Sequence, residues 1–192
     1  ALRCAIRMQR KMEELNQRWS REGTNEKLIA RIGINTGPAV VGNVGGRNRF
    51  DYSAIGDPVN LAARLEPANK AYDTLVMASE FTMREANASD YLTRELDLLA
   101  VKGKNEPVTV FEILEMRDAD LSHARREALS HYNRGLAAYQ RRDWELAAEY
   151  FQAGLDADPE DGPCRVYLGR SREHIANPPP ADWDFVVRRQ VK

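Results

Sequence analysis

Hydrophobic residues in the first part of the chain recur with two different periods. Residues 2–21 carry apolar side chains every three or four positions, which predicts an amphipathic helix with a stripe formed by Met8, Met12, Leu15 and Trp19. Such a stripe belongs to a core far more often than to a cofactor site. Residues 28–35 alternate with a period of two, which predicts a strand. Residues 39–44 and 50–55 predict a hairpin joined through Gly45 and Gly46.

The next residues continue this mixture of elements. Asp57 and Pro58 predict the start of a helix, with Asp57 as N-cap and Pro58 at the first helical position, and Pro67 should end or kink it. Ser79 can cap a short helix. The remaining predicted elements are a strand over 74–78, a helix over 80–88 and a strand pair over 91–101 and 108–114. Helices mixed with hairpins favour an α+β fold.

Beyond residue 121 the pattern becomes helical with a longer repeat. Gly135 and Gly169 are 34 residues apart, the period of the tetratricopeptide repeat, and the other residues at positions typical of that repeat are Ala147, Phe151, Gly154 and Pro159. Helical hairpins of other kinds can imitate this pattern. One repeat and part of a second cannot form a free-standing solenoid, so we expect Trp144, Phe151 and Leu155 to be covered.

These patterns divide the chain into four parts. Residues 1–114 form the α+β domain, 115–121 a polar linker, and 122–177 the tetratricopeptide-like helices. Residues 178–192 begin with three prolines and carry an apolar group, so we expect this tail to dock back onto the fold.

Composition excludes several classes of function. The 192 residues carry a net charge of −1, which gives no global field for binding nucleic acid or an anionic membrane. The two cysteines, Cys4 and Cys164, have no metal-type spacing, and the three histidines form no cluster. No apolar run has the roughly 20 residues needed to span a bilayer. We expect a cytoplasmic protein, and because the chain opens with Ala1 inside a helical pattern, a fragment of a longer one.

The most informative stretch is 49–66. A helix that begins at Pro58 places Asn60 and Arg64 four residues apart and therefore on one face, directly after a strand and the turn at Gly56. An amide and a guanidinium at the start of a helix that follows a strand are suited to binding a sugar and a phosphate. A phosphate-binding loop at Gly45 and Gly46 is the weaker alternative, because the Lys-Ser/Thr of a P-loop is missing.

This stretch resembles the second half of the class III nucleotidyl cyclase catalytic domain, which includes adenylate and guanylate cyclases. The motif is Gly-Asp-x-Val-Asn-x-Ala-x-Arg at 56–64, and the order and spacing of three further stretches agree with it: Arg-Ile-Gly-Ile-Asn-Thr-Gly at 31–37, Gly-Asn-Val-Gly at 42–45 and Val-Lys-Gly-Lys at 101–104. The resemblance covers about residues 1–114 and implies a partial ferredoxin-like cyclase domain followed by the helical, tetratricopeptide-like segment.

The resemblance also implies a reaction and roles for individual residues. The family converts ATP or GTP into the 3′,5′-cyclic monophosphate and pyrophosphate. By motif position, Arg64 corresponds to the arginine that contacts the reacting phosphate and Asn60 to the asparagine that orients the ribose. Ser53 falls at the position that recognises the base. In the family, threonine or aspartate at this position accompanies recognition of adenine, and cysteine accompanies recognition of guanine. Lys102, with Lys104 as a second candidate, corresponds to the lysine that neutralises the triphosphate.

The metal ligands implied by the resemblance are absent from this chain. The two aspartates that hold the Mg²⁺ or Mn²⁺ ions lie upstream of the first helix in the family, and Asp57 is better explained as a helix cap. We therefore expect one half of an ATP-binding homodimer site, inactive on its own.

Other interpretations stay open at this stage. Asn60 alone is explained by backbone capping, and Arg64 by a surface pair with Glu66 or Asp57. The chain could also be a non-catalytic scaffold module whose repeats recruit a partner, or part of a guanylate cyclase. A diguanylate cyclase is disfavoured because its acidic Gly-Gly signature is missing.

Overall fold

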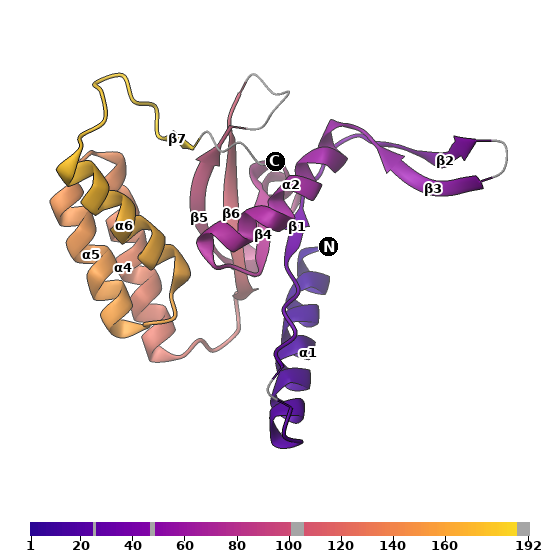
Figure 1. Cartoon of the computed structure of the whole chain (residues 1–192), viewed down its shortest axis with the longest axis horizontal. Helices are drawn as coiled ribbons and strands as arrows, with labels where there is room; N and C mark the ends of the chain where they lie inside the picture. Colours follow the sequence, from indigo (N-terminus) through magenta and orange to yellow (C-terminus); the bar gives the residue numbers. More distant parts are fainter. Residues whose placement is uncertain (25, 47–48, 101–105, 188–192) are drawn as a thin grey trace.

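The structure is a computed structural model that describes residues 1–24, 26–46, 49–100 and 106–187. It contains a mixed α/β part followed by a helical part, in agreement with the predicted α+β class (Figure 1). In chain order the helices are α1 (Leu2–Arg21), α2 (Asp57–Tyr72), α3 (Glu80–Glu85), the 3₁₀ turn η1 (Ala88–Asp90), α4 (His123–Gln140), α5 (Trp144–Ala157) and α6 (Gly162–Ala176). The strands are β1 (Ile32–Ile34), β2 (Val40–Gly46), β3 (Arg49–Ile55), β4 (Val76–Ser79), β5 (Tyr91–Leu99), β6 (Val108–Met116) and β7 (Val186–Val187).

Five strands form the central sheet in the order β1-β4-β6-β5-β7. β1 is parallel to β4, β6 is antiparallel to both β4 and β5, and the short β7 pairs in parallel with β5 at the edge. Strands β2 and β3 form a separate antiparallel hairpin, with Val40 opposite Ile55, that extends away from the sheet (Figure 1). The predicted hairpin is confirmed, but Gly45 and Gly46 lie inside β2 and do not form its turn. The predicted pairing of the next two strands is confirmed as β5 with β6.

Alternation along β4 places two apolar clusters on opposite faces of the sheet. Met77 packs in a cluster with Leu61, Leu65 and Tyr72 of α2. Its neighbours in sequence point the other way and pack in a second cluster with α1, composed of Leu2, Ala5, Ile6, Val76, Ala78 and Ile113. Helix α2 therefore covers one face and α1 the other, as the two-residue period of a strand requires.

The helix predicted over 2–21 is confirmed as α1, but its predicted stripe is only partly covered. The buried residues are Leu2, Ala5 and Ile6, whereas Met8 is 49% exposed and the described chain only partly covers the other stripe residues. A helical period identifies an apolar face, but only the neighbouring elements decide which part of it is covered. In this structure the apolar contacts of α1 with β4 and β6 come from its first two turns, and Arg10 on the next turn pairs with Glu115 of β6.

The prediction for Pro67 also needs correction, because α2 does not end there but continues to Tyr72. A proline removes one backbone donor from a helix. Asn69, which is fully buried, supplies other bonds, since its Nδ2 donates to the carbonyl oxygens of Leu65 at 3.0 Å and Ile32 at 3.1 Å. Burial of Leu65 and Tyr72 on either side of Pro67 favours the continued helix. Helix α3 is also shorter than predicted and ends at Glu85.

The helical part packs against the sheet and α2. Trp144 and Phe151 are buried and Leu155 is half-buried, as predicted, in a cluster formed by the helical part and Trp183. Tyr132 of α4 and Tyr167 of α6 donate hydrogen bonds to the β5 backbone, to Glu95 O at 2.9 Å and to Leu96 O at 2.6 Å. The C-terminal segment also packs on the helical part, because the centroid of the Trp183 ring lies 4.9 Å from that of His174 and 5.4 Å from that of Trp144.

Candidate functional site

The turn between β3 and α2 is built around Gly56. Its φ of 152° and ψ of 161° lie in a region that side-chain-bearing residues avoid, so glycine is needed here. Its carbonyl oxygen accepts hydrogen bonds from the backbone N–H of Val59 at 3.0 Å and of Asn60 at 3.2 Å. The chain therefore passes from strand to helix within one residue, which puts the first turn of α2 directly beside the hairpin.

The predicted capping role of Asp57 is wrong. The N-cap is Gly56, no side chain caps the helix, and Asp57 lies inside the first turn. Because the Gly56 backbone makes the turn, the N-cap is Gly56, one residue before the Asp57 that the sequence pattern predicts. The Asp57 carboxylate still lies at the positive end of the helix dipole, where a negative charge is favourable.

The structure brings three of the predicted residues to the two sides of this turn. Ser53 is half-buried on β3, opposite Gly42 of β2. Asn60 and Arg64 lie one helical turn apart on α2, with Asn60 exposed and Arg64 half-buried. Lys102 and Lys104 fall outside the described residues.

Sequence reasoning missed the loop that follows β1. Asn35 Nδ2 donates to the carbonyl oxygen of Pro58 at 2.9 Å, and its Oδ1 accepts from the Ser79 hydroxyl. A Cβ added to Gly37 would come within 2.6 Å of the Pro58 ring, so the loop backbone lies directly on the helix start. The motif at 31–37 was the available signal, although the resemblance gave its residues no role.

A second close approach ties α2 to the sheet. A Cβ at Gly33 of β1 would lie 2.4 Å from the Ala62 carbonyl oxygen and 2.5 Å from the Glu66 nitrogen. The absence of a side chain lets strand and helix backbones touch, which agrees with the open face predicted at Gly33. The helix that carries Asn60 and Arg64 is thus in direct backbone contact with β1.

Comparison with known proteins identifies the fold. The adenylate and guanylate cyclase catalytic domain matches residues 1–114, more than half of the chain. The chain belongs to this cyclase family. A tetratricopeptide repeat matches residues 128–161, which confirms the 34-residue repeat predicted around Gly135.

Individual cyclases show the same relationship. The terminal-differentiation specific adenylate cyclase of Dictyostelium discoideum is 33% identical over 177 residues, which is 91% of this chain and 8% of that protein. This alignment is longer than the cyclase domain and therefore includes most of the helical part. Adenylate cyclase 1 of Rhizobium meliloti is 38% identical over 115 residues, 59% of this chain and 17% of the relative. The chain thus spans less than a fifth of the length of either protein.

Among solved structures, the adenylyl cyclase CyaB from P. aeruginosa superposes with a TM-score of 0.51. It is 35% identical in sequence, and the match covers 61% of this chain and 58% of that one. The cyclase fold is therefore supported by sequence and by structure.

Cyclases of this family typically work with Mg²⁺ or Mn²⁺. In the described ranges, His, Cys, Asp and Glu residues nowhere gather in a group of three or more that could hold a metal ion. The expectation that other residues supply the metal ligands stays a prediction. No helix among the described residues is long and apolar enough to cross a membrane.

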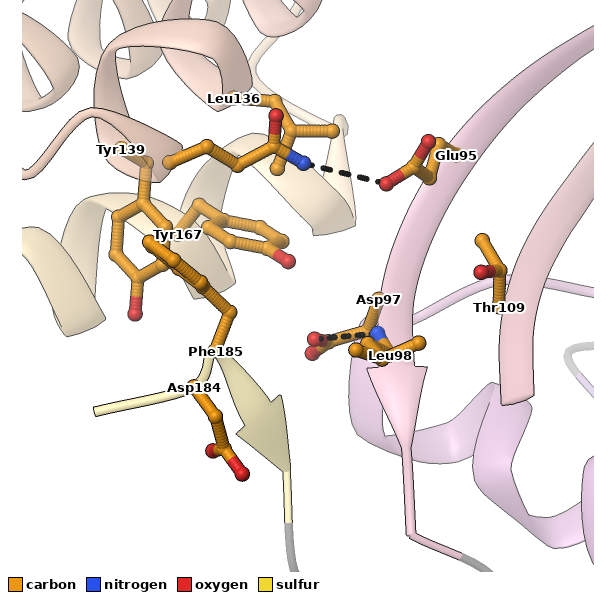
Figure 2. A pocket seen from close by; sticks show the side chains of 10 residues that line it. Glu95, Asp97, Leu98, Thr109, Leu136, Tyr139, Tyr167, Asp184 and Phe185 are labelled. Carbon is orange, nitrogen blue, oxygen red and sulfur yellow. Dashed lines mark hydrogen bonds between the residues drawn. The ribbon is translucent and has the colours of Figure 1, made fainter. Parts of the chain in front are cut away.

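A cavity of about 270 Å³ lies elsewhere, between β5, the helical part and the C-terminal segment. Figure 2 shows Glu95 and Asp97 on the sheet side facing Tyr139, Tyr167 and Phe185. Burial raises the pKa of Glu95 and the neighbouring Asp97 adds to this, whereas the Gln140 hydrogen bond lowers it. Ser53, Asn60 and Arg64 are not among the residues that line this cavity, so it is separate from the predicted nucleotide site.

Proposed function

We propose that this chain supplies the asparagine–arginine half of an adenylate cyclase site, which converts ATP into 3′,5′-cyclic AMP and pyrophosphate. The observation that carries the proposal is the β3–Gly56–α2 unit, with Ser53 before the turn and Asn60 and Arg64 on the first two turns of the helix. Membership of the cyclase family and the adenylate cyclase relatives support ATP as the substrate.

Each residue has a distinct task in this proposal. The ribose 3′-hydroxyl attacks the α-phosphorus, and negative charge builds up on the phosphoryl oxygens as pyrophosphate leaves. The Arg64 guanidinium presents several donors in a fixed plane and stabilises that charge. The Asn60 amide orients the ribose so that its hydroxyl lies in line with the breaking bond. Ser53 hydrogen-bonds the base, and Lys102, or Lys104 as the second candidate, neutralises the triphosphate.

The exposed hairpin supports a homodimer through the cyclase domain. Val40 is 76% exposed and Tyr52 is 78% exposed, and Val41, Val44 and Ile55 are also largely uncovered. Such an apolar surface marks an interaction site more often than a free surface. In the proposed dimer one cyclase domain contributes Asn60 and Arg64, and the other contributes the aspartates that hold the metal ions.

The remaining parts of the proposal concern the chain as a whole. We assign residues 1–114 to the cyclase domain, 115–121 to a linker, 122–177 to the helical module and 178–192 to a docking tail. We expect the isolated chain to form no cyclic nucleotide, because its described residues contain no group of His, Cys, Asp and Glu side chains that could hold the metal ions. We place the protein in the cytoplasm or on the cytosolic side of a larger sensor.

Complementation between two inactive variants tests this proposal. In the full-length dimer, Arg64→Ala should lower kcat by about 10²–10³, the scale for loss of one preorganised donor, and leave nucleotide binding largely intact. A second variant lacks an upstream metal-binding aspartate. Mixed dimers contain one site with both defects and one site with neither, so part of the activity should return.

Three outcomes would contradict the proposal. They are normal turnover by the Arg64→Ala dimer, cyclic AMP formation by the isolated chain, and no recovery in mixed dimers whose formation has been verified. Arg84→Ala is the matched control, because Arg84 is an exposed helical arginine on α3 that pairs with Glu80. It should leave turnover unchanged.

A further inference from the structure

Helix α2 begins without a side-chain cap. The N-cap residue is Gly56, which offers no side chain, and among the described residues the helix start has no side-chain cap hydrogen bond. The direction of an uncapped first turn depends on whatever packs around it. Because the proposed function places Asn60 on this turn and Arg64 on the next, the external contacts of the turn set where both point.

Asn35 makes the polar contact to this turn. Its Nδ2 reaches the Pro58 carbonyl oxygen at 2.9 Å, two residues before Asn60 in sequence. A carbonyl oxygen has two lone pairs, so this bond can coexist with the helical one. The contact joins the residue that follows β1 to α2, 23 residues later in the chain, and is part-buried, which limits competition from water.

The rest of the Asn35 side chain is fixed by the sheet. Its Oδ1 accepts from the Ser79 hydroxyl at the end of β4, and the Ser79 oxygen in turn accepts from the Thr82 N–H as the cap of α3. Both ends of the Asn35 amide are therefore engaged, one with the sheet and one with α2. The sheet thereby dictates where the Pro58 carbonyl lies.

Backbone contacts of the residues next to Asn35 also hold the first turn of α2 in place. Gly37 lies against the Pro58 ring, and a Cβ at Gly56 would come within 3.3 Å of the Pro38 carbonyl oxygen. The loop over 35–39 thus encloses the turn that begins α2. Its only side-chain hydrogen bond to α2 among the described residues is that of Asn35.

We propose that Asn35 is a positioning residue for the cyclase reaction, which holds the first turn of α2 so that Asn60 and Arg64 reach the ribose and the reacting phosphate. This inference rests on the proposed function of Asn60 and Arg64. Asn35 touches neither substrate nor metal in it. A displacement of about 1 Å at a reacting centre can lower turnover by about 10²-fold, so one hydrogen bond at this point has a large effect on rate.

Two substitutions of Asn35 and one neighbouring control test the inference in the full-length protein. Asn35→Asp keeps the acceptor for Ser79 but places a carboxylate oxygen opposite the Pro58 carbonyl oxygen. Asn35→Ala removes both bonds and adds no charge, so it serves where the aspartate variant fails to fold. Thr36→Val removes the neighbouring hydrogen bond to the Thr82 hydroxyl, at 3.1 Å, which makes no contact with α2.

The expected result is a selective loss of turnover. Both Asn35 variants should lower kcat by about 10- to 100-fold, with KM for ATP within about twofold of wild type. Thr36→Val should leave both constants within about twofold. Values of kcat within twofold of wild type in a folded Asn35 variant would overturn the inference, and so would an equal loss in Thr36→Val.

A double-mutant cycle separates positioning from general destabilisation. If Asn35 acts through Asn60 and Arg64, Asn35→Ala should lower the residual rate of an Asn60→Ala/Arg64→Ala variant by less than about threefold, because both residues that it positions are already gone. The same 10- to 100-fold loss in that background would overturn the inference and leave the proposed function intact. Normal turnover of Arg64→Ala alone would instead contradict the proposed function.

Discussion

Arg94 Nη1 donates to both carboxylate oxygens of Asp161, at 2.9 and 2.8 Å, although 67 residues separate them in sequence. Arg94 lies on β5 of the cyclase domain and Asp161 caps α6 of the helical part, and both side chains are 1% exposed. Arg94 also pairs with Glu112 of β6, and Arg125 of α4 bonds to Asp161 at 3.0 Å. A buried ionic network therefore joins the two parts of the chain.

Loss of the Asp161 charge should destabilise the whole fold. Asp161→Asn leaves two arginines with one fewer counter-charge in a site that excludes water. Breaking a buried pair in this way costs about 3–5 kcal/mol of unfolding free energy. Urea unfolding of the chain, followed by circular dichroism, measures the change. Glu160→Gln, an exposed neighbour, is the control and should change stability little, while a loss below about 1 kcal/mol for Asp161→Asn would show that the network adds nothing.

The same pair should make stability depend on pH in the acid range. Burial raises the pKa of Asp161, but Arg94, the Cys164 N–H and Arg125 outweigh it and hold that pKa below its usual range. A carboxyl whose folded pKa is depressed contributes stability above its unfolded pKa of about 3.9 and loses it as the pH falls towards the folded value.

The difference in unfolding free energy between wild type and Asp161→Asn should therefore be constant from about pH 5 to 7 and shrink below about pH 4. Comparing the two proteins cancels the contributions of other carboxylates, such as Glu115, whose pKa the Arg10 hydrogen bond lowers against the effect of burial. A difference that stays constant down to pH 3 would exclude titration of Asp161 as the cause.

Ser53 should give the enzyme a modest preference for ATP. A serine hydroxyl both donates and accepts, so it discriminates weakly between the edges of adenine and guanine. In competition assays the full-length enzyme should form more cyclic AMP than cyclic GMP. Ser53→Thr should increase that ratio and Ser53→Cys should decrease it, whereas Ser89→Cys, at an exposed position, should not. Preferential cyclisation of GTP by the wild type would reverse the substrate assignment.

Much of the fold could be predicted because its signals are local. The hairpin around β2 and β3, the cap at Ser79 and the turn at Gly56 each depend on residues close together in sequence. The cyclase and tetratricopeptide assignments likewise came from motifs at fixed spacing, and the family matches confirm them. The roles of Asn60 and Arg64 rest on the same motif and stay predictions.

The errors and omissions concern contacts between distant residues. No local pattern links Arg94 to Asp161, and each reads in isolation as an ordinary surface charge. The period of α1 indicated an apolar face but not which turns meet β4 and β6. Asn35 contacts Pro58, 23 residues later, and although the motif at 31–37 marked this stretch, nothing in it indicated Pro58 as the partner.

The two glycines at equivalent repeat positions should respond oppositely to alanine. A Cβ at Gly135 would lie 2.7 Å from Cε1 of the fully buried Phe151 ring, so Gly135→Ala should cost about 1–3 kcal/mol of unfolding free energy. Gly169 is exposed inside α6, and a Cβ there would meet nothing within 4 Å among the described residues.

Gly169→Ala should therefore stabilise the chain by about 0.5–1 kcal/mol, the usual gain when alanine replaces glycine in a helix interior. The contrast arises because α5 supplies Phe151 to cover Gly135, whereas no described side chain covers Gly169. Thermal and urea unfolding of both variants measure the two effects side by side. Equal destabilisation by both would mean that something beyond the described residues packs on Gly169, and equal stabilisation would mean that Phe151 yields to the added methyl group.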